Sequence, residues 1–237
     1  MAQPLPVIDT YAFPVTVPSS GAQISLRPYL VREEKILLMA QESNNYSDQA
    51  EAVGQVIQNC TNGAIDPRKA PFFDIEYLLL QIRARSVGEV ATPTYQCHNI
   101  TDGVECGHRT IVRVNLANVK VEGDMIPQPI ELTPKYTLTL RWPTIFTIDD
   151  LFFAAVSNNA PNTSGLINKL ADLFDKLVDT ETGTEYAFVD YTEKEKINFL
   201  ETLPTSCYDK LVEFVSNMPS LKTSIDYKCE RCEFEHH

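Results

Sequence analysis

Alternating hydrophobic and polar residues predict a β-hairpin near the start of the chain. Residues 12–17 and 22–27 are strand-like segments on either side of residues 18–21, a cluster of turn-forming Pro, Ser and Gly. Pro14 lies inside the first segment. Because proline has no amide proton to donate to a ladder, the first strand is expected at a sheet edge.

Amphipathic helices are predicted after this hairpin. Apolar residues recur at helical spacing over residues 31–43, 47–60 and 74–85. In the first helix, the side chains expected on one apolar face are Ile36, Leu37, Met39 and Ala40. The third helix has a wide apolar face, and Arg83 and Arg85 at its end suit the negative end of the helix dipole.

The pattern changes to a period of two beyond Gly88. Short strands are expected over residues 110–114 and 119–121. Residues 130–142 form a longer candidate, in which residues 136–142 alternate cleanly between apolar and polar side chains. This alternation is typical of a half-buried strand.

Most of the chain beyond this strand is predicted to be helical. Thr147, followed by Asp149-Asp150 and an apolar run, has the pattern of a helix N-cap, and residues 158–162 read as a loop. Another amphipathic helix is marked by Leu166, Leu170, Leu173 and Leu177.

Two more helices and a strand are expected before the tail. Thr192 and Glu195 have the spacing of a capping box for a helix that runs through Leu200. Pro204 opens the next helix, whose apolar residues are Leu211, Phe214 and Val215. Residues 220–227 are predicted to form a last strand that leads to Cys229.

Composition and charge narrow the class of protein. The 237-residue chain is 43% hydrophobic and 22% charged, as globular proteins are. A formal net charge of −12 disfavours the wrapping of a nucleic-acid backbone. No apolar run approaches the roughly 20 residues of a membrane-spanning helix, and the first residues lack the pattern of a secretory signal. We therefore expect a soluble, acidic, intracellular protein.

Four of the six cysteines have the arrangement of a metal site. Cys229 and Cys232 form a Cys-x-x-Cys knuckle, while Cys97 and Cys106 are separated by eight residues that Asp102-Gly103 could turn back. Both pairs have a Tyr two residues before the first Cys, and Gly107 follows Cys106 as in many zinc-ribbon knuckles. A zinc site usually takes four such ligands. We therefore predict one structural zinc ion held by the four thiolates, a closed site without an open coordination position.

Other interpretations of these cysteines remain open at this point. His98 or His108 could replace Cys97 or Cys106 as a ligand, or the four could be ordinary thiols or two disulfides. A redox role is weaker, because a redox Cys-x-x-Cys normally opens a helix in a βαβ unit. The remaining cysteines, which fall on apolar helix faces and are expected in the core, are Cys60 and Cys207.

The predicted fold class is α+β. It comprises a helical core, small antiparallel sheet elements and a zinc-ribbon-like four-cysteine site that joins the middle of the chain to the C-terminus. The expected regions are a hairpin and helical region (1–90), a β-rich region with the first Cys knuckle (91–143), a helical region (144–219) and the Cys-x-x-Cys tail that closes the metal site (220–237).

The sequence offers no catalytic constellation. Residues 19–21 lack the Gly-x-Ser-x-Gly context of a nucleophile elbow, and no Gly-rich phosphate loop precedes a Lys-Ser/Thr pair. Carboxylates such as Asp149-Asp150 and Glu193 with Glu195 are explained by helix starts. We therefore predict that the protein is not an enzyme.

Several separate segments occur together in one known family. They are Leu5-Pro6, residues 18–21, residues 24–29, residues 32–40, residues 73–89 and Tyr95-x-Cys97. With the late Cys-x-x-Cys, they make most of the chain resemble the baseplate hub protein family of T-even-type bacteriophages with contractile tails. The resemblance implies a structural or assembly protein of the virion tail baseplate, with no catalytic residues to carry over.

The resemblance also implies the protein's partners and location. The partners would be other baseplate and tail proteins, with no membrane, and assembly would occur in the host cytoplasm, where thiols stay reduced. The alternative is a zinc-stabilised regulatory or nucleic-acid-binding module, for which only residues 83–85 and 109–113 offer a small basic cluster. Residues 1–11, with Pro4 and Pro6 and little periodicity, are expected to order against a neighbouring protein.

Overall fold

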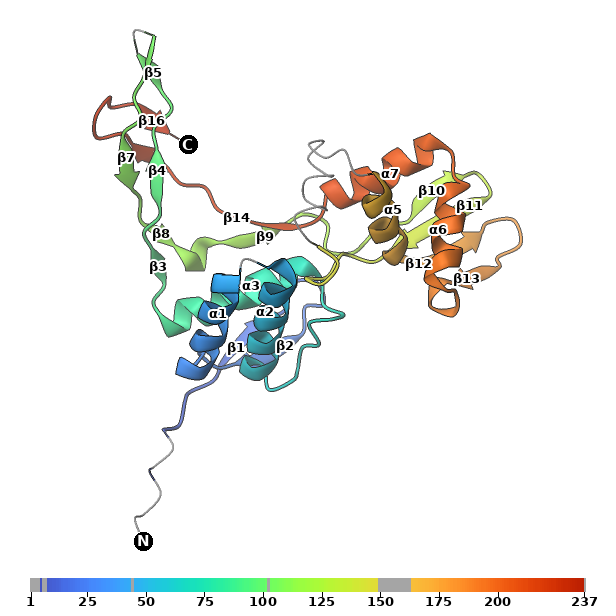
Figure 1. Ribbon diagram of the computed structural model, residues 1–237, viewed down its shortest axis with the longest axis horizontal. Helices are drawn as coiled ribbons and strands as arrows, with labels where there is room; N and C mark the ends of the chain where they lie inside the picture. Colours follow the sequence, from blue (N-terminus) through green and yellow to red (C-terminus); the bar gives the residue numbers. More distant parts are fainter. Residues whose placement is uncertain (1–4, 6–7, 44, 102, 149–162, 237) are drawn as a thin grey trace.

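The protein consists of two lobes and a long ribbon arm (Figure 1). The computed structural model describes residues 5, 8–43, 45–101, 103–148 and 163–236, and the side chains of residues 163–166 lie outside this description. Lobe 1 comprises residues 13–86, the ribbon arm comprises residues 90–115 and 227–236, and lobe 2 comprises residues 130–140 and 163–216. This α+β architecture confirms the predicted fold class.

Lobe 1 begins with the predicted hairpin. Strand β1 (Phe13–Thr16) pairs antiparallel with β2 (Gln23–Leu26), and Phe13 lies opposite Leu26. The two strands form a sheet of their own, so Pro14 lies in an edge strand as predicted. Gly21 adopts a φ of +66° in the turn, a conformation that glycine reaches without a steric cost.

Three helices complete lobe 1: α1 (Val31–Ser43), α2 (Tyr46–Cys60) and α3 (Phe72–Ser86). Their shared core joins apolar residues of the hairpin, α2 and α3 with Ile145 from a later segment of the chain. Its buried members are Val15, Leu26, Ala50, Val56, Ile57, Cys60, Ile75, Leu78, Ile82 and Ile145. The hairpin therefore packs on the helices rather than standing alone.

The apolar face predicted for α1 is partly wrong. Met39 is 59% exposed, and the buried residues of this helix are Glu33 and Ala40, with Leu37 packed on the core between them. Residues 33, 37 and 40 follow helical spacing, so they share one face. The buried charge at Glu33 breaks the apolar pattern from which the face was predicted.

The ribbon arm is a ladder of short antiparallel pairs. They are β3 (Val90–Ala91) with β8 (Val114–Asn115), β4 (Thr94–Gln96) with β7 (Arg109–Ile111), and β5 (Ile100–Thr101) with β6 (Val104–Glu105). The predicted strand 110–114 is thus divided between two pairs. A further pair from the end of the chain, β15 (Tyr227–Lys228) with β16 (Glu235–His236), lies beside β4 and β7 (Figure 1).

A two-stranded connection joins the arm to lobe 2. After the short helix η1 (Leu116–Asn118), strand β9 (Lys120–Glu122) carries the chain out, and β14 (Ser220–Lys222) carries it back in antiparallel register. Gly123, at a φ of +123°, lies so close to Pro219 that an added Cβ would be 3.0 Å from the Pro219 Cα. The chain therefore enters and leaves lobe 2 at adjacent points.

Lobe 2 is an antiparallel sheet covered by helices. The strand order is β10 (Ile130–Thr133), β11 (Tyr136–Leu140), β12 (Phe174–Asp179) and β13 (Glu185–Ala187). The helical elements are α5 (Thr163–Asp172), η2 (Phe188–Asp190), α6 (Glu193–Glu201) and α7 (Thr205–Ser216). Trp142 packs edge-on against Phe73 of α3 and stacks at 4.4 Å on Phe214 of α7, so its indole ring links the two lobes.

The helix predicted to extend through Leu177 is wrong in its second half. Helix α5 ends at Asp172, and Leu177 lies on β12 opposite Leu138 of β11. Residues 174–179 (Phe-Asp-Lys-Leu-Val-Asp) do not alternate strictly between apolar and polar side chains, and pairing with β11 makes them a strand because it buries Leu177 against the sheet. The region 144–219 accordingly contains two strands of the sheet as well as helices.

The remaining elements predicted between residues 147 and 227 are partly confirmed. The Thr192 capping box is confirmed, and α7 begins directly after Pro204. Strand 220–227 is divided into β14 and the start of β15. The helix predicted to begin after the N-cap Thr147 and the loop 158–162 lie outside the described residues, as does the side chain of Leu166. Within the described part, no helix combines the length and hydrophobicity that crossing a membrane requires.

Candidate metal centre

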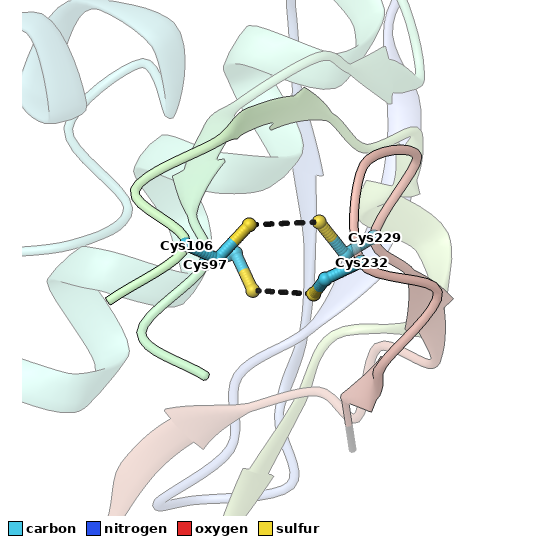
Figure 2. A group of neighbouring side chains, drawn as sticks. All are labelled: Cys97, Cys106, Cys229 and Cys232. Carbon is cyan, nitrogen blue, oxygen red and sulfur yellow. Dashed lines mark hydrogen bonds between the residues drawn. The ribbon is translucent and has the colours of Figure 1, made fainter. Parts of the chain in front are cut away.

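Four cysteine sulfurs from two distant parts of the chain meet on the ribbon arm (Figure 2). The Sγ atoms of Cys97 and Cys232 are 3.6 Å apart, and those of Cys106 and Cys229 are 3.8 Å apart. All four Sγ atoms lie within 4.8 Å of one another. The structure thus brings together the four residues that the sequence singled out.

The two cysteine pairs sit in knuckles with the same backbone hydrogen bonds. In each, the N–H of the first cysteine donates to the carbonyl two residues after the second cysteine, and the residue directly after the second cysteine donates back to the first. The bonds are Cys97 to His108 at 2.8 Å, Gly107 to Cys97 at 2.9 Å, Cys229 to Phe234 at 2.9 Å and Glu233 to Cys229 at 3.0 Å. The knuckles are therefore structural equivalents despite their different spacings.

The irregular spacing of the first knuckle is explained by an inserted hairpin. The N–H of Cys106 donates to the carbonyl of Asn99 at 2.8 Å, which closes the base of the β5–β6 hairpin. Residues 100–105 thus leave and return at one point of a knuckle that would otherwise read Cys-x-x-Cys-Gly. The insertion leaves the arrangement of the two thiols intact.

The residue after the second cysteine has the same left-handed conformation in both knuckles. The φ angle is +63° at Gly107 and +58° at Glu233. Glycine adopts this conformation freely, whereas a residue with a Cβ pays a steric cost of about 1 kcal/mol. The second knuckle tolerates that strain at Glu233.

Backbone amides surround the sulfurs and favour their thiolate forms. Each Sγ accepts from the N–H two residues further along, and the donors are Asn99, His108, Arg231 and Phe234. The bond from Phe234 leads the contributions that lower the pKa of Cys232 to about 6. Burial has the opposite effect and raises the pKa of Cys97 to about 12. A cation would relieve the cost of holding negative sulfur in this buried position.

Aromatic rings support the knuckles from one side. Tyr95 and Tyr227, the tyrosines of the repeated Tyr-x-Cys pattern, stack with centroids 5.8 Å apart. Tyr227 also stacks on His236 at 4.6 Å, and the Nε2 atom of His236 lies 3.2 Å from the sulfur of Cys97. The repeated Tyr-x-Cys pattern marks the two tyrosines in the sequence, whereas no spacing rule marks His236.

The histidines considered as alternative ligands face elsewhere. His98 is exposed and contacts the carboxylate of Glu105, and the Nε2 atom of His108 lies 3.8 Å from the carboxylate of Glu230. Within the described residues, the group with metal-binding geometry contains the four cysteines and neither histidine. All six cysteines are free thiols in this structure.

The sulfur positions fit a tetrahedral metal. Zinc–sulfur bonds of about 2.3 Å place the sulfurs of a regular tetrahedron about 3.8 Å apart, close to the two Sγ–Sγ distances above. Soft thiolate donors select zinc or iron among the common biological metals. The donor set and its spacing therefore suit a structural zinc ion.

Cys60 and Cys207 lie in the cores of the two lobes, as predicted. Burial raises the pKa of Cys60 to about 11, which disfavours a reactive thiolate. The thiol of Cys207 donates to the carbonyl of Leu132 at 3.2 Å. Both are packing residues.

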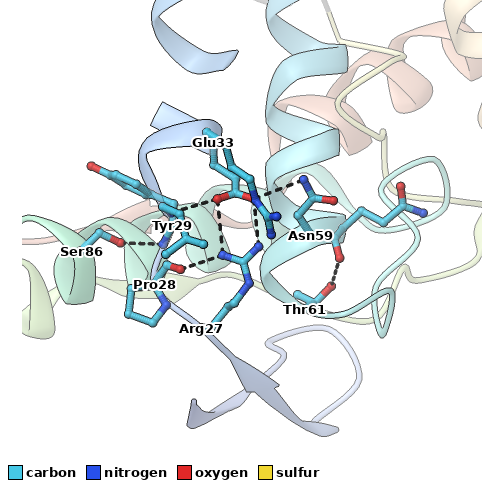
Figure 3. A network of polar contacts seen from close by, with 10 residues as sticks. Arg27, Pro28, Tyr29, Glu33, Asn59, Thr61 and Ser86 are labelled. Atoms are coloured by element: carbon cyan, nitrogen blue, oxygen red, sulfur yellow. Dashed lines mark hydrogen bonds and ion pairs between the residues drawn. The ribbon is translucent and has the colours of Figure 1, made fainter. Parts of the chain in front are cut away.

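A buried ion-pair network in lobe 1 gathers charged side chains away from the cysteine cluster (Figure 3). The fully buried Glu33 carboxylate accepts from Arg27 at 2.9 Å, from Arg32 at 2.7 Å and from the backbone N–H of Leu30 at 2.9 Å. Burial alone would raise the pKa of Glu33, but these donors outweigh it and lower the pKa to about 2. The network fixes the start of α1 against β2 and the end of α2, where Asn59 also contacts Glu33.

The structure also gathers cations that the sequence analysis did not single out. A hollow of about 530 Å³ is lined by Arg68, Lys69, Arg141, Lys169 and Lys196, from separate parts of the chain. Arg68 pairs with Glu51 at 2.6 Å, and Arg141 donates to the carbonyl of Asp172 at 2.8 Å. These two cations already have partners within the chain and provide no independent sign of an anionic ligand.

Fold and site together define an α+β protein whose projecting ribbon arm is closed by a four-cysteine cluster. The model of the T4 bacteriophage base plate protein family matches residues 10–237, nearly the whole chain. The chain belongs to this family, which confirms the resemblance inferred from the sequence at the level of the baseplate. Neither the curated proteins nor the solved structures that were searched include a match. Family membership makes the protein part of a multi-subunit phage assembly with other tail proteins.

Proposed function

We propose that the protein is a non-enzymatic structural or assembly component of the baseplate hub, stabilised by one structural zinc ion bound to Cys97, Cys106, Cys229 and Cys232. It acts through contacts with other baseplate and tail proteins. Assembly takes place in the host cytoplasm, and the protein then belongs to the virion tail baseplate.

The convergence of four thiols within 4.8 Å is the observation that carries the zinc assignment. Four unlinked thiols with backbone N–H donors aimed at their sulfurs form a pocket made for thiolates. Four protein ligands fill a tetrahedral shell, so no position is left for a reacting water molecule. The zinc ion would stabilise the fold of the ribbon arm and would not take part in a reaction.

Exposed apolar side chains support a role in protein contacts. Ile100 and Val104 are exposed at the tip of the ribbon arm, and Val31, Leu38 and Met39 are exposed on α1. Apolar surface of this kind is more typical of protein interfaces than of nucleic-acid interfaces, which are strongly basic. The net charge of −12 points the same way.

Elemental analysis of protein purified without a chelator tests the zinc site. One equivalent of zinc per chain is expected, and Cys229→Ser should lose it. Cys60→Ser and Cys207→Ser are matched controls, because they remove buried thiols outside the cluster, and both should retain zinc. Less than about a tenth of an equivalent of zinc or iron in the unmodified protein would contradict the proposal.

Quantitative mass spectrometry of purified particles and of hub assembly intermediates tests the baseplate role. The protein should be found in the intermediates that contain hub proteins, and cross-linking should join it to baseplate neighbours. The regulatory or nucleic-acid-binding alternative instead predicts DNA binding that weakens steeply with salt. Such binding, without recovery from particles or intermediates, would overturn the hub assignment.

A further inference from the structure

Lobe 2 carries an apolar hollow that the proposed function does not use. The hollow has a volume of about 430 Å³ and lies between the sheet and α6. Five aromatic side chains dominate its lining: Tyr136, Tyr186, Phe188, Tyr191 and Phe199. The lining carboxylate, Glu195, is already bound to Thr192 in the capping box. The chemistry of the hollow therefore suits an apolar segment rather than a charged ligand.

The N-terminal segment, residues 5–11, precedes β1 and exposes apolar side chains at a regular spacing of three. Leu5 is 90% exposed, Ile8 is 85% exposed and Tyr11 is 63% exposed. A polyproline II helix has three residues per turn, so these residues would line one of its faces. Pro4 and Pro6 favour that conformation, because the proline ring fixes φ near the polyproline II value.

We propose that residues 5–11 of one copy of this chain bind, as a polyproline II segment, in the apolar hollow on lobe 2 of a second copy. Grooves lined by aromatic rings are the usual binding surface for such segments. At about 3.1 Å per residue, Leu5 to Tyr11 spans roughly 19 Å, which presents three apolar anchors along one face. Docking would bury the exposed side chains of the N-terminal segment and cover the hollow at the same time.

The position of the N-terminal segment favours a second copy as the partner. Figure 1 shows this segment leaving lobe 1 on the side away from lobe 2. The N-terminal segment and the hollow are different surfaces, so the contact between two copies is heterologous. Repetition of such a contact links copies head to tail.

Sedimentation velocity of the full chain over a range of concentrations is the first test. We expect concentration-dependent association that is lost when residues 1–11 are deleted, with an unchanged melting temperature. A full chain that stays monomeric at all concentrations would overturn the proposal. A monomeric full chain would contradict the proposal even if a free peptide of the N-terminal segment bound the protein that lacks residues 1–11. The two results together would mean that the segment binds the hollow of its own chain.

Fluorescence anisotropy with a labelled peptide of residues 1–12 locates the contact. The protein lacking residues 1–11 should bind the peptide saturably, and Tyr186→Ala at the rim should weaken binding at least tenfold. Ile126→Ala, at an exposed apolar side chain outside the hollow, is the control and should leave binding unchanged. If Tyr186→Ala fails to fold, Ile8→Asp in the peptide tests the same contact without altering the receptor. Absent binding, or binding that neither change weakens, would contradict the proposal, while zinc content and recovery from particles test the proposed function independently.

Discussion

Glu33 shows how one residue can organise a lobe. Its buried carboxylate joins two arginines and a backbone amide at the point where β2 and α1 meet. Removing one partner from a buried, hydrogen-bonded ion pair leaves the others desolvated without compensation. The cost of losing this carboxylate is therefore larger than that of losing an exposed charge.

The lowered pKa of Glu33 predicts a specific loss of stability in acid. The folded-state pKa of about 2 lies below the usual value of 4.5. Stabilisation by the carboxylate is therefore complete above about pH 5 and is lost as the pH falls towards 2. The full contribution is on the order of 3 kcal/mol. Thermal melts followed by the fluorescence of the single tryptophan, Trp142, should show this decline.

Glu33→Gln should lower the melting temperature at pH 7 and flatten its dependence on pH between 5 and 2. Glu34→Gln, at an exposed neighbouring position, is the control and should change neither. Parallel pH profiles for the unmodified protein and Glu33→Gln would show that another group governs the acid response.

His236 is expected to strengthen metal retention without acting as a ligand. Its ring nitrogen lies beside the sulfur of Cys97, and its stacking on Tyr227 fixes the ring. In His236→Phe the stacked ring remains and the polar contact is lost. Partners of metal ligands typically contribute 10–100-fold to affinity, so a competing chelator should remove zinc at a correspondingly lower concentration. His98→Phe should behave like the unmodified protein, and equal retention by both variants would deny His236 this role.

At the scale of elements, the β5–β6 hairpin is an insertion that the first knuckle does not need. Deleting residues 100–105 joins Asn99 to Cys106, which already bond through their backbones, and restores a Cys-x-x-Cys-Gly sequence. The shortened protein should bind one zinc ion with an affinity within about tenfold of the original. Chelator competition measures this, and Cys106→Ser in the shortened protein should abolish binding. A folded deletion protein that no longer binds zinc would show that the hairpin supports the site.

Elements with strong local signals could be predicted from the sequence. The wide apolar stripe of α3 and the reciprocal Thr192–Glu195 cap depend on neighbouring residues, and both are confirmed. Strand β12 could not be predicted, because its pairing with the distant β11 outweighs a helical spacing of leucines. The buried face of α1 was misplaced because Glu33 is polar, and only its partners from other elements make its burial favourable.

The candidate site was predictable in its residues but not in its construction. The Cys-x-x-Cys tail and the repeated Tyr-x-Cys pattern pointed to the four thiols that the structure brings together. The equivalence of the two knuckles depends on backbone hydrogen bonds across an inserted hairpin, which residue spacing conceals. The position of His236 depends on its stacking on Tyr227, which in turn stacks on Tyr95 of the other half of the site.

At the scale of the whole molecule, lobe 2 is an excursion of the chain between the two halves of the cysteine site. Both lobes have separate apolar cores. We therefore expect metal removal to loosen the ribbon arm while the lobes remain folded. Binding energy of order 10 kcal/mol is typical of small zinc domains, and here it would act mainly on the arm.

Limited trypsin digestion with and without a chelator tests this separation. The ribbon arm offers cleavage sites at Arg109, Lys228 and Arg231. Cleavage there should accelerate after chelation, before any change in the melting of the lobes, and added zinc should restore protection. Arg83 within α3 is the internal control and should stay protected. Simultaneous cleavage at all these sites would mean that the site supports the entire fold.

The β9–β14 connection has a mechanical consequence for a baseplate protein. Both strands run from the arm to lobe 2, and the cysteine cluster joins their outer continuations. A force that pulls the ribbon arm away from lobe 2 would therefore be shared as tension by the two strands. The hydrogen bonds between the strands lie across the pulling direction and would carry little of this force. With the cluster open, the outer end of β14 would be slack and the whole force would pass through β9. The cysteine site would thus determine whether lobe 2 is held by two tethers or by one.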